Sequence, residues 1–354
     1  MKSELFSSYK LRDVTFKNRI FLSPMCQYSA QNGVPNDWHM VHLGARAIGG
    51  AALIIAEATG ITPEGRISVG CLGIWNDIQQ DAFKRINAFI KSQGAIPGIQ
   101  LIHAGRKAST DVSWKGGKSI SKEEGGWETL GPSAVTYSSS YPAPKEMSRE
   151  DIYDHVDHFV KAAQRSVAAG FEVIELHMAH GYLLHQFLSP ISNVRSDEFG
   201  GALENRMRFP LMVAKAVREA LPENLPLFVR ISATDWAEGG WNENESVILC
   251  EEFKKIGVDF MDISTGGNVH GVTIPVGPLY QVPFAKLIKA KTGMPTGAVG
   301  LITKPSEAEA LIANGDVDAV LIGRELLRDP NWPLKAAKTL GADVEIPPQY
   351  SRAF

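Results

Sequence analysis

Short apolar runs recur along the chain, and each is followed by a stretch with helical periodicity. Because such an alternation places parallel strands inside a layer of helices, it restricts the chain to an α/β architecture. Most of the runs begin just after a glycine, the residue that commonly ends a helix. The eight predicted strands span residues 19–24, 51–58, 95–102, 171–177, 225–231, 258–264, 294–299 and 318–323.

Eight strand–helix pairs predict a closed (β/α)₈ barrel, a TIM barrel, as a single domain over residues 1–354. An open doubly wound sheet usually has a glycine-rich first turn, whereas the turn at residues 24–28 lacks a GxGxxG pattern. The sequence therefore favours the barrel over the open sheet.

Two of the predicted helices have distinctive sequences. The clearest, residues 149–169, repeats apolar residues along one face, and Ser148 is its expected N-cap. The helix predicted for residues 325–340 contains Pro330 and Pro333, which makes it the least regular.

Two segments interrupt the alternation. Residues 103–147 are rich in Gly, Ser, Pro and aromatic residues and are too long for a passive connection, so we expect them to cap the barrel mouth. The C-terminal tail, residues 346–354, is too short and Pro-rich to form an element and by itself suggests a frayed end.

Charge and cysteine content limit the partners. The chain has 36 basic and 39 acidic residues, a net charge of −3, and no block of like charge. A nucleic-acid or membrane partner is therefore not indicated, and we expect a small-molecule substrate. Three widely spaced cysteines suit a reducing compartment. Because neither a signal peptide nor a run of about 18 apolar residues is evident, we expect a cytoplasmic protein.

The chemistry of a barrel gathers at the carboxyl ends of its strands. The last three predicted strands end in small residues, and the final strand is followed by Arg324. Backbone N–H groups and a guanidinium would converge there, which predicts a phosphate site, although glycines can also simply end strands. The glycines concerned are Gly266, Gly267, Gly297, Gly300 and Gly323.

Arg230 ends an apolar run that would otherwise face the barrel interior. A buried guanidinium is costly unless it is paired. Two interpretations remain open: a salt bridge to a carboxylate such as Glu57 or Glu175, or a ligand that carries or develops negative charge.

His177 and His180 have a spacing that would allow metal ligation. The neighbouring strand ends supply Met25, Ala58 and Gln100 where a metallohydrolase would place carboxylates and histidines, so we expect no metal at this site. Either histidine alone could be a core residue, but two followed by Tyr182 suggest donors for one substrate oxygen.

Cys26 and Tyr28 follow the first predicted strand. Cys26 is either a small buried hydrophobe or a reactive thiol, and the sequence offers no nearby base that would make it a nucleophile. A tyrosine at position 28 could either pack in the core or bind a ligand.

Several motifs in order resemble one family. They include FKNRI at 16–20, SPMCQY at 23–28, GIQLIHAGRK at 98–107, IELHMAHGY at 174–182 and IGRELLRDP at 322–330. The sequence resembles the Old Yellow Enzyme family of flavin-dependent ene-reductases, in particular its bacterial, thermophilic-like branch with a cysteine near the flavin. The 110–131 segment looks longer than in compact members, and the pair here is His-His where other members have His-Asn.

The resemblance implies FMN as a tightly bound cofactor, NADPH or NADH as reductant, and ping-pong hydride transfer to the activated C=C bond of an enone. His177 and His180 would hold the substrate carbonyl, and Tyr182 would donate the proton, with Tyr28 or water behind it. Cys26 would tune the flavin. The implied cofactor-binding residues are Ser23, Pro24, Met25, Cys26, Ala58, Gln100, Arg230, Gly300, Gly323 and Arg324.

The resemblance also implies a homo-oligomer, a dimer or dimer-based tetramer, in which the tail of one subunit reaches the active site of its neighbour through Arg352. Two alternative functions stay open at this point. One is a metal-dependent barrel hydrolase, and the other is a flavin-binding module without catalytic activity.

Overall fold

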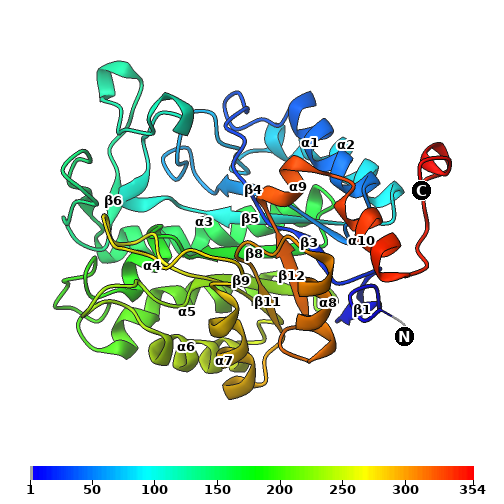
Figure 1. Cartoon of the computed structure of the whole chain (residues 1–354). Coiled ribbons are helices and arrows are strands. Elements are labelled where there is room, and N and C mark those ends of the chain that lie inside the picture. The colour runs from blue at the N-terminus through cyan, green and yellow to red at the C-terminus, as the bar shows by residue number, and fades with distance from the viewer. Residues whose placement is uncertain (1–2) are drawn as a thin grey trace.

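The computed structural model describes residues 3–354, and within them parallel strands close into a barrel whose spatial order follows the chain order (Figure 1). All eight predicted strands are confirmed, with ends that shift by a few residues. They are β3 (Ile20–Leu22), β4 (Leu53–Gly60), β5 (Ile96–Ile102), β8 (Val173–Met178), β9 (Leu227–Ser232), β10 (Phe260–Ser264), β11 (Thr296–Ala298) and β12 (Ala319–Ile322).

The barrel strands are buried on both faces, as expected for parallel strands that helices enclose. Aromatic rings fill the barrel interior near the amino ends of the strands, where Phe228 and Phe260 stack with centroids 4.5 Å apart. Phe16, from the hairpin of β1 (Tyr9–Leu11) and β2 (Val14–Phe16), closes the amino end against Phe21. The amino-terminal part of the interior is therefore a packed core.

Helices surround this barrel (Figure 1). The longer ones are α1 (Asp37–Ile48), α2 (Asp77–Ser92), α3 (Arg149–Ala168), α5 (Leu203–Ala220), α6 (Glu243–Ile256), α7 (Val282–Thr292), α8 (Pro305–Ala313) and α10 (Trp332–Leu340). The shorter ones are α4 (Leu183–Leu188) and α9 (Arg324–Arg328). None of the helices in residues 3–354 is both long and apolar enough to cross a membrane.

The predicted N-cap of α3 is confirmed, since the Ser148 hydroxyl accepts a hydrogen bond from the Asp151 N–H at 3.0 Å. The single helix predicted for residues 325–340 is wrong, because the chain there forms α9 and then α10. Pro330 lies between them and has no N–H to continue a helix, while Pro333 occupies the first turn of α10, where proline is tolerated.

The 103–147 segment contains three 3₁₀ turns, Gly105–Lys107, Ser113–Lys115 and Lys122–Glu124, and the short strands β6 (Leu130–Gly131) and β7 (Lys145–Glu146). Its first turn is fastened to the carboxyl ends of barrel strands, because Lys107 Nζ donates to the carbonyls of His180 and Gly267, each at 2.8 Å. Its role as a cap remains a prediction.

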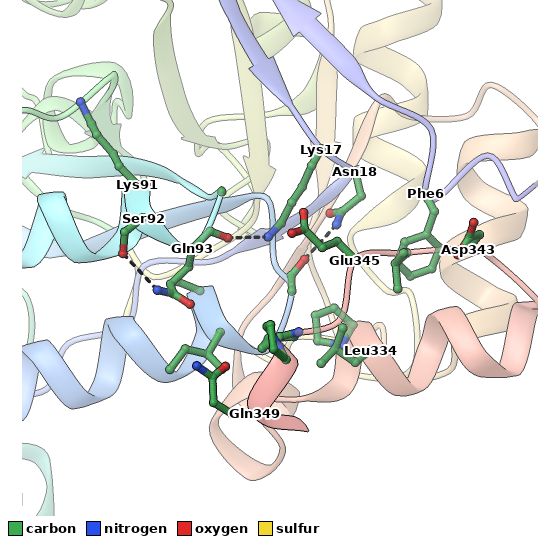
Figure 2. Close-up of a pocket in the computed structure, with 18 residues that line it drawn as sticks. Phe6, Lys17, Asn18, Lys91, Ser92, Gln93, Leu334, Asp343, Glu345 and Gln349 are labelled. Atoms are coloured by element: carbon green, nitrogen blue, oxygen red, sulfur yellow. Dashed lines mark hydrogen bonds between the residues drawn. The ribbon is translucent and has the colours of Figure 1, made fainter. Parts of the chain in front are cut away.

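The C-terminal tail runs along the opposite end of the barrel. There a cavity of about 760 Å³ lies at the amino ends of β3–β5, between Lys17, Gln93 and tail residues such as Gln349 (Figure 2). The segment Pro348–Tyr350 forms one 3₁₀ turn at its edge, so the expectation that the tail forms no element is wrong. The last residues project away from the barrel (Figure 1).

Candidate active site

Two adjoining cavities, of about 220 and 200 Å³, open at the carboxyl ends of the strands. They share His180, Arg230, Gly323 and Arg324, so they form one continuous site. The first is lined by residues that the sequence analysis singled out, namely Ser23, Pro24, Met25, Cys26, Ala58, Gln100, His177, His180, Tyr182, Arg230, Gly323 and Arg324. Gly300 lines the second cavity, whereas Tyr28 and Arg352 line neither.

Strand register brings these side chains together. His177 on β8 lies beside Arg230 on β9, and Arg230 lies beside Asp262 on β10. In the same layer, Gln100 on β5 is paired with Glu175 on β8. Because paired residues on neighbouring parallel strands point the same way, the barrel interior acquires a polar layer directly beneath the cavity.

Arg230 is paired with Asp262, with Nε 3.0 Å from Oδ2. The partners proposed from the sequence, Glu57 and Glu175, are therefore wrong. Glu57 instead accepts a hydrogen bond from the Gln27 N–H at 2.8 Å and has an oxygen 3.4 Å from Nε2 of His39.

Burial, followed by the charge of Asp262, raises the pKa of Glu175 to about 8, and burial raises the pKa of Asp262 to about 6 despite Arg230. At neutral pH Glu175 is therefore mostly protonated. It accepts a hydrogen bond from Gln100 Nε2 at 2.7 Å, which holds the amide of Gln100 at the base of the cavity. The layer thus carries one ion pair, Arg230–Asp262, and one neutral carboxylic acid.

The two histidines form a directed chain of hydrogen bonds. His177 Nδ1 accepts from the Ala179 N–H at 3.2 Å, so its Nε2 carries the proton and donates to His180 Nδ1 at 3.3 Å. His180 Nε2–H then donates to the Ser264 hydroxyl at 2.7 Å. Burial, and then the positive charge of Arg230, holds the pKa of both histidines well below the usual range, so both are neutral.

Tyr182 packs edge-on against the His177 ring, with centroids 5.0 Å apart. Burial raises the pKa of its hydroxyl well above the usual range, so it remains protonated. The neighbouring Cys71, together with burial, raises the pKa of the Cys26 thiol well above its usual range, although Tyr28 acts in the opposite direction. A protonated thiol is a poor nucleophile.

The glycines at the last three strands do not converge as predicted. Gly300, with φ +128°, and Gly323 line the second cavity together with Arg324 and Arg328. Gly266 and Gly267 do not line it; Gly267 allows close packing instead, because a Cβ there would lie 2.7 Å from His180 Cα.

Gly297 is a core position as well, because a Cβ there would lie 2.8 Å from the ring of Phe260 in the barrel interior. The phosphate prediction therefore narrows to Gly300, Gly323 and Arg324.

Lys107, a half-buried lysine whose ammonium group lies 5.2 Å from the centre of the Tyr182 ring, was not singled out from the sequence. Burial, and then the nearby Arg106, lowers its pKa to about 7, while the two carbonyl acceptors favour the charged form. Asp262 and Ser264 were also missed. Only the register that places Asp262 beside Arg230 would have singled them out.

Residues 4–343 match the sequence model of the NADH:flavin oxidoreductase / NADH oxidase family. The chain belongs to this family. It is 48% identical over 356 residues to an NADPH dehydrogenase of Geobacillus thermodenitrificans, an alignment that covers 100% of this chain and 99% of the relative.

Solved structures of this family share the barrel. Morphinone reductase superposes with a TM-score of 0.79 at 26% identity, covering 99% of this chain and 93% of that one. An old yellow enzyme homologue from Zymomonas mobilis gives 0.78 at 25% identity, covering 97% and 94%. The resemblance to the Old Yellow Enzyme family is confirmed, while the branch with a flavin-proximal cysteine remains a prediction.

Family membership settles the choice among the alternatives left open by the sequence. The chain is a flavin-dependent NAD(P)H oxidoreductase with FMN as its cofactor, and not a metal-dependent hydrolase. A dehydrogenase reaction in close relatives also disfavours the flavin-binding module without activity.

Proposed function

We propose that this oxidoreductase is an ene-reductase, which uses NADPH or NADH to reduce the activated C=C bond of enones and related electrophiles. The observation that carries the proposal is the neutral pair His177 and His180 in one cavity with the buried cation Arg230. Neutral donors beside a fixed positive charge suit a substrate oxygen that gains negative charge during the reaction.

The site fits FMN. The buried Arg230 has one carboxylate partner, Asp262, and its other side faces the cavity, which suits an anionic ring edge. Arg324 and the backbone at Gly300 and Gly323 line the adjoining cavity, which suits a phosphate. We assign binding of the flavin ring to Ser23, Pro24, Met25, Cys26, Ala58, Gln100 and Arg230. We assign binding of the phosphate to Gly300, Gly323 and Arg324.

When bound, FMN supplies hydride transfer, first from the nicotinamide and then to the substrate. We assign a ping-pong sequence, in which the nicotinamide and then the enone bind in turn at the one site that the two adjoining cavities form. The polypeptide holds the substrate oxygen, provides a proton and shields the site from water.

The substrate oxygen would accept the hydrogen bond that His177 Nε2–H now donates to His180. His180 becomes the second donor when its proton moves from Nε2 to Nδ1. Ser264 permits this shift, because its hydroxyl can turn and donate to His180 Nε2, while Gln281 keeps the hydrogen bond from Thr265 at 2.8 Å. Such oxyanion donors are each worth on the order of 10²–10³ in rate.

We assign the proton that completes the reduction to Tyr182, with Tyr28 or water behind it. The half-buried Tyr182 side chain packs against His177 and stays protonated, so it can donate to a developing carbanion. Cys26 adjusts the flavin and is not a nucleophile, because the neighbouring Cys71 and burial keep its thiol protonated.

We further assign Arg352 to the active site of a neighbouring subunit in a dimer or dimer-based tetramer. In its own subunit the tail runs along the amino ends of the strands, opposite the cavity, and Arg352 is exposed. We also propose that the substrate is a small molecule and that the protein is cytoplasmic. Residues 103–147 would cap the barrel mouth.

The test begins with the visible spectrum of the purified protein and anaerobic titration with NADPH, which should bleach the flavin bands. Steady-state rates with 2-cyclohexenone as the oxidant should then give parallel double-reciprocal lines and cyclohexanone as the product. Bleaching by NADPH without any enone reduction would leave a flavin oxidoreductase and refute the ene-reductase.

A further inference from the structure

Outside the cavity, three potential metal ligands meet beside the barrel mouth. Glu64 follows β4, His103 follows β5 and His155 lies on α3. One ligand atom from each residue lies within 4.8 Å of the others. None of the three lines either active-site cavity, so the proposed reaction makes no use of them.

The nitrogens that face this point have no hydrogen-bond partner among the described residues. His103 is 2% exposed and His155 is 5% exposed, yet Nε2 of each is unpaired. Buried polar atoms are nearly always paired in folded proteins, so two such atoms aimed at one point indicate an additional group between them.

Hydrogen bonds on the far side of each ring determine what the nitrogens offer. His155 Nδ1 donates to the Asp151 carbonyl at 2.6 Å, which leaves a lone pair on Nε2 and orients the ring as carbonyl partners do in metal sites. His103 Nδ1 accepts from the Gly105 N–H at 3.1 Å, so its Nε2 carries a proton. Ligation by His103 moves that proton to Nδ1 and breaks the bond from Gly105.

His158, one turn after His155 on α3, has its ring 5.2 Å from that of His155 and an Nδ1 that is unpaired among the described residues. It does not belong to the three residues whose ligand atoms lie within 4.8 Å of one another, so the proposed site does not include it.

We propose that Glu64, His103 and His155 form a binding site for a divalent transition-metal ion of the zinc type. Two imidazoles and one carboxylate are a ligand set that zinc uses, whereas calcium and magnesium require oxygen ligands throughout. The ion joins the loop after β4, the end of β5 and α3. It thereby anchors the start of the 103–147 segment from outside the active site.

The test uses the untagged, FMN-loaded enzyme after treatment with EDTA and desalting. Titration with zinc chloride in a non-chelating buffer should show one equivalent bound. A crystal soaked with zinc should give one anomalous peak, measured at the zinc edge, within ligand distance of Glu64, His103 and His155.

His155→Gln removes the Nε2 lone pair, which can bind a metal without a change of tautomer. Glu64→Gln removes the charge of a half-buried side chain with little risk to folding. Each should weaken zinc binding by at least about 100-fold, since the loss of a mere outer-shell partner already costs about 10–100-fold. His270→Gln, at an exposed histidine, is the matched control and should bind as the parent does.

If zinc binds equally well to Glu64→Gln and to the parent, the ion lies elsewhere, and that result overturns the proposal. So does the absence of a stoichiometric binding event, which would leave the two nitrogens facing each other or a water molecule. Zinc binding is measured as heat in the titration and as anomalous scattering in the crystal. Neither outcome therefore depends on the reaction at the flavin.

Discussion

Replacing Glu175 by Gln should flatten the dependence of stability on pH. The folded protein raises the pKa of Glu175 from 4.5 to about 8, chiefly because the side chain is buried. A carboxyl with a raised pKa favours folding while it is protonated, so its contribution is complete below pH 4.5 and is lost as the pH rises towards 8.

The magnitude follows from the shift. Each pKa unit corresponds to about 1.4 kcal/mol, and integration from pH 5 to pH 8 gives a loss of about 3 kcal/mol from this one group. The amide in Glu175→Gln would keep a carbonyl that accepts from Gln100 and would carry no charge at any pH, so the variant should lose that much less stability over the same interval.

The assay is urea unfolding of parent and variant in excess FMN at pH 5 and pH 8. The difference between the two proteins cancels the titrating groups that do not interact with Glu175, and so reports on Glu175 together with its neighbour Asp262. Glu219→Gln, at a side chain that is 67% exposed, is the control and should follow the parent. Equal pH dependence in the parent and Glu175→Gln would mean that Glu175 is already ionised at pH 5, and would refute the reasoning.

Five other variants test the remaining assignments. Arg324→Ala should purify largely without flavin, and full yellow occupancy would contradict the phosphate site. Ala at His177 or His180 should retain FMN but weaken phenol binding and slow enone reduction on the order of 10²–10³-fold, so unchanged titrations would count against the pair. Cys26→Ala should shift the flavin potential and keep measurable turnover; complete loss of activity with intact flavin would identify a nucleophile. Arg352→Ala should raise KM for the enone by an amount equivalent to about 2–5 kcal/mol with flavin retained, and a monomer with unimpaired kinetics would exclude the shared site.

The barrel was predictable because the strands are short apolar runs, most of which begin just after a glycine, and burial on both faces leaves little ambiguity in such runs. The short hairpin β1–β2 was not predicted. Its strands have three residues each, too few for a periodicity, and it is held by packing of Phe16 against the barrel interior. The break between α9 and α10 follows from the prolines, which the sequence displayed without showing which one would end the helix.

The candidate site was predictable as far as strand ends determine it, since residues such as Met25, Gln100 and Arg324 lie where their strands end. The partner of Arg230 was not predictable, because a pairing between strands depends on register, and a one-residue change reverses the direction of the side chain. Asp262 lies beside Arg230 only because β9 and β10 align at those positions.

A single-turnover experiment tests the central claim most directly. The enzyme is reduced anaerobically with one equivalent of NADPH, freed of nucleotide by gel filtration, and mixed with 2-cyclohexenone in a stopped-flow spectrometer. The account predicts that the flavin absorbance returns in one phase and that one equivalent of cyclohexanone forms per flavin, with no nucleotide present. Reduced enzyme that stays bleached in the presence of the enone, and recovers its colour only when oxygen is admitted, would contradict it.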